Sequence, residues 1–146
     1  MHYIFKKQCK EGVEGMRDIK FRAYNPRDKK MHYDITGIEI VNDGSISGIF
    51  IDGAFFLIEE VYLMQYTGLK NKNGKEIYEG DIVEWAGIKM EVFWGEDIGI
   101  GYGFCWKPCG DNSDYHESMT GFIDEYEVIG NIYENKDLLE KEGKEE

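Results

Sequence analysis

The chain has 146 residues and a formal net charge of −12. Its length fits one ordinary domain, or two small β subdomains that share a core. No apolar run approaches the roughly 20 residues that a membrane-spanning helix needs, and residues 1–15 lack the apolar segment of a secretory signal. Three cysteines fit a reducing compartment better than a disulfide framework. We therefore expect a cytoplasmic protein without membrane contact.

The charge is distributed unevenly. Residues 17–33 hold six basic side chains against Asp18 and Asp28, and the part from Asp34 onward is strongly acidic. The basic residues are Arg17, Lys20, Arg22, Arg27, Lys29 and Lys30. An acidic body repels nucleic-acid phosphates and suits a basic partner. The alternative is that the charge only keeps a small protein soluble.

Residues 1–15 show no convincing periodicity. We expect Met16, rather than Met1, to be the biological start, and residues 1–15 to be an upstream extension. The codons for Lys10–Gly12 are compatible with a purine-rich ribosome-binding sequence. If the extension is real, it is expected to be a frayed terminus.

Alternating apolar and polar residues then predict a series of short strands. In Asp18–Tyr24, Ile19, Phe21 and Ala23 alternate with Lys20 and Arg22, which is the period of a half-buried strand. A turn at Pro26 leads to a returning strand at Met31–Tyr33. Further strands are expected at Ile35–Val41 and Ile46–Ile51, and Ala54–Ile58 is an apolar run too short to assign to a strand or a helical turn.

The central stretch, Glu59–Trp85, is expected to form one unit. A strand over Glu60–Thr67 is followed by Asn73-Gly74, for which we predict a type I′ turn because both central residues of that turn need a positive φ. Glu76–Tyr78 returns, and Gly80 turns the chain into a strand at Asp81–Trp85.

The second half continues the pattern. Strands are expected at Ile88–Trp94, at Ile100–Trp106 and within Phe122–Tyr133, with a loop over Pro108–Ser118. Asn135 is placed to cap a short terminal helix over Lys136–Lys141. We predict an all-β fold, a glycine-turn meander or small barrels, with residues 16–134 as one domain. Its expected subdomains are 16–67 and an SH3-like barrel over 68–134, and residues 135–146 form the short helix and acidic tail.

Several segments resemble a known family. The run Met64–Lys70, followed by Asn73–Val83, resembles the signature of the YopX family of phage and prophage proteins. Ile19–Tyr24 is similar to the opening strand of that family, and Val128–Asn135 is similar to its closing segment. The resemblance covers roughly Met16 to Leu139. It implies a mostly β fold and a bacterial host, and it carries over no catalytic residue.

Cysteine chemistry is weakly indicated. Cys105 and Cys109 with His116 offer three candidate zinc ligands, whereas a zinc site usually takes four in two close pairs. A thioredoxin-like motif needs two intervening residues, and here there are three. The alternative, two ordinary reduced cysteines beside a loop, is the one we expect, and Cys9 lies in the N-terminal extension.

Other catalytic patterns are also incomplete. Gly74-Lys75 lacks the Ser or Thr and the helix of a phosphate-binding loop, and alternation continues through Gly99–Gly103 instead of opening a dinucleotide site. Glu79, Asp81 and Glu84 could perform acid/base work or bind a metal. His32 and His116 are candidate bases with no serine or cysteine nearby in sequence. We predict no enzyme activity, no cofactor and no metal.

Tyrosines offer a last candidate surface. Such rings can stack nucleic-acid bases, or they can cover sheet faces with their hydroxyls in water, which we expect for most of them. They are Tyr24, Tyr33, Tyr78, Tyr102, Tyr115, Tyr126 and Tyr133. The sequence favours a non-enzymatic phage or prophage accessory protein that binds a host or phage protein and could also form a homo-oligomer. The alternatives are a nucleic-acid-associated role for residues 17–33 and an acidic mimic of DNA.

Overall fold

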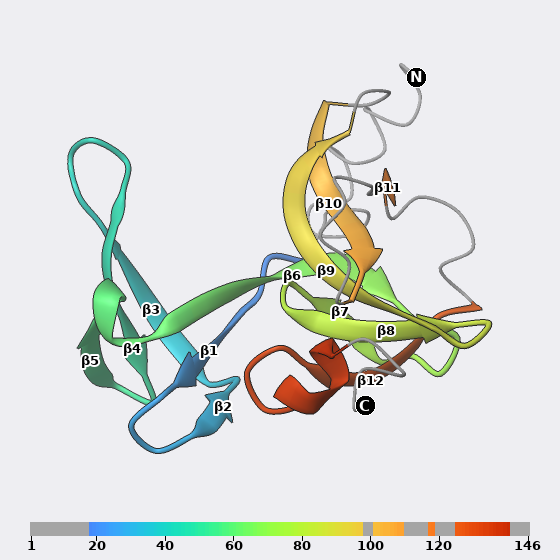
Figure 1. The fold of residues 1–146 in the computed structure, drawn as a ribbon. Helices are drawn as coiled ribbons and strands as arrows, with labels where there is room; N and C mark the ends of the chain where they lie inside the picture. Colours follow the sequence, from blue (N-terminus) through green and yellow to red (C-terminus); the bar gives the residue numbers. More distant parts are fainter. Residues whose placement is uncertain (1–17, 98–100, 110–116, 119–124, 141–146) are drawn as a thin grey trace.

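The computed structural model describes residues 18–97, 101–109, 117–118 and 125–140, which form three antiparallel sheets (Figure 1). The four-stranded sheet has the order β2-β1-β6-β7 and contains β1 (Phe21–Asn25), β2 (Lys30–His32), β6 (Tyr62–Lys70) and β7 (Glu76–Tyr78). The three-stranded sheet has the order β3-β4-β5, with β3 (Ile35–Ile40), β4 (Ile46–Ile51) and β5 (Ala54–Leu57). The predicted all-β class is therefore confirmed.

The five-stranded sheet is built from the second half of the chain. Its order is β11-β10-β9-β8-β12, with β8 (Asp81–Trp85), β9 (Ile88–Asp97), β10 (Gly101–Pro108), β11 (Glu117–Ser118) and β12 (Glu127–Asn131). Strands β8 to β11 form a meander, and the last strand, β12, pairs beside β8. Strand β9 is strongly curved (Figure 1). Within the described residues no pairing joins the edge strands β11 and β12. Closure into an SH3-like barrel therefore stays a prediction.

The hydrophobic core is divided into two clusters. One contains Ala23, Ile49, Ile51 and Val61, beneath the three-stranded sheet. The other lies within the five-stranded sheet and its neighbours, and consists of Ile77, Val83, Met90, Val92, Trp106 and Tyr126. Strand β6 runs between the two groups of strands (Figure 1), with Leu63 packed on the first cluster and Leu69 on the second. The predicted boundary between residues 67 and 68 falls inside β6, and the division into subdomains stays a prediction.

The turn at Asn73-Gly74 differs from the prediction. Gly74 has a φ of +80°, but Asn73 does not have a positive φ, so this is not a type I′ turn. The Asn71 side chain changes the geometry, because its Oδ1 accepts hydrogen bonds from the amides of Asn73 and Lys75. Both central φ angles are positive instead at Asp52-Gly53 and Ala86-Gly87, as a type I′ turn requires.

The apolar run at Ala54–Ile58, which the sequence left unassigned, forms the largely exposed strand β5, and a 3-10 turn follows at Ile58–Glu60 (η1). The expected terminal helix is a single 3-10 turn, η3 (Lys136–Leu139). Asn135 does not cap it with its side chain, which instead accepts a hydrogen bond from the Asn131 amide.

Candidate functional site

Arg22 does not belong to an exposed basic surface, contrary to the sequence-based expectation. Strand β1 is central in its sheet, between β2 and β6, and the Arg22 side chain is only 3% exposed. Its Nη2 lies 2.8 Å from Asp81 Oδ1 and donates to the Glu79 carbonyl at 3.0 Å. The guanidinium carbon also lies 4.8 Å from the centre of the Tyr78 ring. Arg22 therefore ties β1 to the start of β8 inside the protein.

The predicted carboxylate cluster is divided among separate structural contacts. Burial raises the pKa of the Asp81 carboxyl, against the opposing effect of Arg22 and of the Tyr78 amide, which donates to Asp81 Oδ2 at 2.8 Å. Burial likewise raises the pKa of Glu79, whose carboxylate accepts a hydrogen bond from the Gln65 amide. Glu84 pairs in register with Lys89 and Glu127 across the sheet. Within the described parts of the chain, no three His, Cys, Asp or Glu side chains are grouped to hold a metal ion.

Two cysteines lie on β10 and directly after it. Cys105 is buried, and Cys109 is half-buried beside Lys89, whose carbonyl accepts a hydrogen bond from the Cys109 amide. Burial, with a contribution from Glu91, raises the pKa of Cys109 to about 11. Such a thiol is protonated at neutral pH and is a poor nucleophile or metal ligand. His116 and Cys9 lie outside the described residues, and His32 pairs with Asp28 at 2.8 Å.

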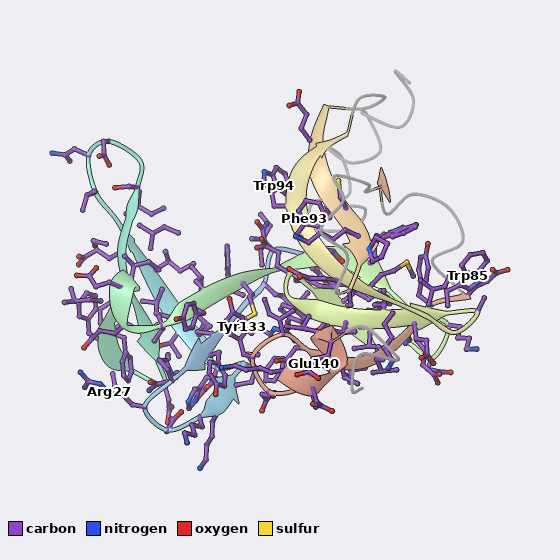
Figure 2. The ribbon with its side chains drawn as sticks, viewed as in Figure 1. Arg27, Trp85, Phe93, Trp94, Tyr133 and Glu140 are labelled. Atoms are coloured by element: carbon purple, nitrogen blue, oxygen red, sulfur yellow. The ribbon has the colours of Figure 1, made fainter. Side chains whose placement is uncertain are left out.

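Only part of the predicted basic surface is available. Lys20 forms an ion pair with Glu76, and Arg22 is buried. Arg27 projects from the β1–β2 hairpin (Figure 2), where it lies 3.7 Å from Glu60. Lys29 and Lys30 are exposed in the same hairpin, and Arg17 lies outside the described residues. The exposed cations that remain for binding therefore lie in the β1–β2 hairpin, at Arg27, Lys29 and Lys30.

The predicted tyrosines lie in different environments. Tyr133 stacks between Tyr24 and Tyr62, with ring centroids 5.3 and 4.7 Å apart, and this column joins the segment after β12 to the four-stranded sheet (Figure 2). Tyr78 and Tyr126 are buried. Tyr115 and the side chain of Tyr102 lie outside what the structure describes. The sequence did not single out Tyr62, because its partner Tyr133 is 71 positions away.

The three-stranded sheet has an exposed apolar face, which we call the outer face. It consists of Gly37, Glu39, Gly48, Phe50, Phe55 and Leu57. Phe55 is 42% and Leu57 46% exposed, and the Phe55 ring packs on Phe50 with centroids 5.1 Å apart. A Cβ at Gly48 would collide with the Phe55 ring, so the glycine lets that ring lie flat across β4. The opposite face of β4 carries Ile49 and Ile51 into the core.

A cleft of about 450 Å³ opens beside the same sheet. It lies between β3 and the segment that enters β1, and we call it the β3 cleft. Its lining residues are Ile19, Lys20, Phe21, Tyr33, Ile35, Thr36, Gly37, Ile38 and Tyr78. Ile19 is 65% and Tyr33 59% exposed, and the Tyr33 ring meets Tyr78 edge-on. No single residue type marks this cleft in the sequence, because its walls come from three separate segments.

Within the described residues, no helix is long and apolar enough to cross a membrane.

Comparisons with known proteins identify relatives of the chain. The family model described as YopX protein matches residues 20–140. Among solved structures, the chain is similar to the crystal structure of protein EF1440 from Enterococcus faecalis, with a TM-score of 0.58 and 29% sequence identity. That match covers 84% of this chain and 99% of the other. No curated protein matches the chain.

Proposed function

We propose, because the chain belongs to the YopX family, that it is a phage or prophage accessory protein that acts without catalysis. Its function is to bind a host or phage protein in the cytoplasm of a bacterial host. The three-stranded sheet is the binding element.

The observation that supports the proposal is the exposure of apolar side chains on the outer face of the three-stranded sheet. Phe55 and Leu57 are each more than two-fifths exposed, next to Phe50, on a sheet with no layer over that face in the described structure. Contiguous exposed apolar side chains of this kind mark protein interaction sites in soluble proteins. Aromatic residues are also enriched in the energetically dominant parts of interfaces.

The polar groups that could have performed catalysis are used elsewhere. Asp81 neutralises the buried Arg22, and the Glu79 carboxylate accepts a hydrogen bond from the backbone amide of Gln65. Cys109 has a raised pKa, which keeps the thiol protonated. These contacts support a binding module rather than an enzyme, since general acid/base work needs such groups free to reach a substrate.

A second candidate is favoured by the exposed cations of the β1–β2 hairpin. Arg27, Lys29 and Lys30 could contact phosphates in a nucleic-acid-associated role. The net charge of −12 opposes that role and favours a basic protein partner, including a protein that normally binds DNA. If the chain mimics DNA, binding to its partner will weaken steeply as salt is raised.

A pull-down from bacterial host lysate tests the proposal. Tagged full-length chain is compared with the Phe55→Ser/Leu57→Ser variant, each with and without nuclease, and bound proteins are identified by mass spectrometry. We expect a dominant protein that survives nuclease and is lost with the variant. Enrichment that disappears with nuclease would replace the proposal with the nucleic-acid role, and recovery of the bait alone would point to a homo-oligomer.

A further inference from the structure

We propose that the β3 cleft binds an extended segment of the partner, which pairs with the free edge of β3 as an added strand. The segment has apolar residues at alternating positions and Lys or Arg between them. This inference rests on the proposed protein-binding function and specifies where and how the partner is held. The outer face then lies beside the docked segment and contacts the rest of the partner.

The position of β3 in its sheet provides the free edge. Among the described residues, β3 pairs with β4 and with no other strand, and Thr36–Ile38 line the cleft on the opposite side. Hydrogen bonding alternates along an antiparallel pair. Ile51 and Ala54 flank a two-residue hairpin loop, and their backbones hydrogen-bond to each other. The backbone N–H and C=O of Phe50, one residue before Ile51, therefore point toward β3, where Phe50 pairs with Gly37. Ile38, one residue further, then directs its backbone N–H and C=O away from β4, and it lines the cleft.

An unpaired strand edge is a template for another strand, and natural proteins protect such edges with charges, proline or a covering element. Here β3 carries one charged side chain, Glu39, and no proline. Its six residues span about 20 Å, given a rise of about 3.3 Å per residue. A partner segment of five or six residues therefore fits the edge, and β-strand addition is an established mode of peptide recognition.

The walls of the cleft determine the side chains that fit. Ile19 and Tyr33 expose apolar surface in the lining of the cleft, and Ile35 contributes a further apolar side chain. Side chains of an added strand alternate between the two faces of the sheet, so every second residue meets these walls. A volume of about 450 Å³ is within the range of pockets that bury small apolar groups.

The charges next to the cleft determine what lies between those apolar residues. Asp18 precedes Ile19, and Asp34 stands between Tyr33 and Ile35; both are exposed. Among the described lining residues the cation is Lys20, which is already paired with Glu76. The rim is therefore acidic, in agreement with the net charge of −12, and it attracts Lys and Arg on the bound segment.

Selection from a random 12-residue peptide display library on the full-length chain tests the inference. Enriched peptides are synthesised with a fluorophore, and their dissociation constants are measured by fluorescence anisotropy. The chain offers a matched pair of variants, Ile19→Ser in the cleft and Ile88→Ser on β9, away from β3, since the two isoleucines are 65% and 48% exposed. Neither substitution removes a buried side chain, so we expect both variants to fold.

We expect enriched peptides to alternate apolar residues with Lys or Arg, and to bind Ile19→Ser roughly tenfold more weakly while binding Ile88→Ser unchanged. N-methylation of single peptide amides should weaken binding at every second position, because only alternate amides face β3. Peptides that bind Ile19→Ser with full affinity but lose affinity for Phe55→Ser would refute the β3 cleft as the binding site. The proposed protein-binding function would remain intact. Absence of enrichment over an unrelated acidic protein would also overturn the inference, whereas the proposed function fails only in the pull-down.

Discussion

Replacing Arg22 with Met should be among the most destabilising single changes in this protein. The substitution keeps a long apolar side chain but leaves the Asp81 carboxylate buried without the cation that lies 2.8 Å away. Removing one partner of a buried ion pair costs about 3–5 kcal/mol. The hydrogen bond to the Glu79 carbonyl adds about 1 kcal/mol, and the retained volume of Met offsets part of the total. We expect a loss of about 4 kcal/mol, a large share of a typical domain's stability of about 5–15 kcal/mol.

The loss should depend on pH. Burial already raises the pKa of Asp81, and without Arg22 it rises further, because the nearest opposing charge is gone. A carboxyl whose pKa is higher in the folded state than in the unfolded state binds protons more tightly when folded. Arg22→Met should therefore regain stability as pH falls from 7 toward the unfolded pKa of about 4. The double variant with Asp81→Asn should be more stable than the sum of the single losses by about 2 kcal/mol.

Urea unfolding followed by tryptophan fluorescence measures these free energies, since Trp85, Trp94 and Trp106 all lie in the five-stranded sheet. Lys20→Met is the matched control, because it removes the ion pair of a residue two positions away along the chain, whose side chain is 45% exposed. Little change is expected for the control. If Arg22→Met unfolded at the same urea concentration as Lys20→Met, the structural role assigned to the buried pair would be refuted.

Three further outcomes follow from the structure. Asn71→Ala should cost about 2 kcal/mol in urea unfolding, because it removes the acceptor for two amides of its turn, whereas the exposed Lys72→Ala should not; equal midpoints would contradict the turn geometry. Gly48→Ala should cost about 1–3 kcal/mol, since its Cβ would lie 2.6 Å from the Phe56 carbonyl oxygen. Gly37→Ala, which meets only the Phe50 ring at 3.2 Å, should cost less, and the reverse order would count against the packing of the outer face. Alkylation of Cys109 by iodoacetamide, followed by peptide mass spectrometry, should be slow at pH 8 and accelerate toward pH 11; rapid labelling at pH 8 would show that burial does not raise its pKa.

Local patterns predicted most of the strands because alternation and turn residues act over short distances. The strand pair about Gly44 and the hairpin at Asp52-Gly53 needed only alternating isoleucines and a glycine with positive φ. The turn after Asn71 was assigned to the wrong class because a side-chain oxygen two residues before the Asn-Gly pair decides its geometry. That interaction is local, and an Asn directly before a turn could have indicated it.

The site depended on contacts that no local pattern contains. Arg22 alternates with apolar residues as an exposed strand residue would, and only the placement of β1 between two strands buries it against Asp81, 59 positions away. Likewise, the β3 cleft brings together residues near positions 19, 36 and 78. Ala54–Leu57 is apolar throughout, but the edge position of β5 leaves Phe55 and Leu57 exposed. The exposure of these side chains is therefore determined by the tertiary arrangement of the strands and not by the hydrophobic pattern of the sequence.

Hydrogen–deuterium exchange with and without a bound partner tests the central claim most directly, because it locates binding on the chain. The ligand is the protein recovered in the nuclease-treated pull-down or a peptide from the display selection. We predict slower exchange in peptides covering Ile35–Leu57, which contain β3, β4 and β5, and unchanged exchange in β8 and β9. Protection confined to Asp81–Asp97, with none across Ile35–Leu57, would contradict the claim that the three-stranded sheet is the binding element.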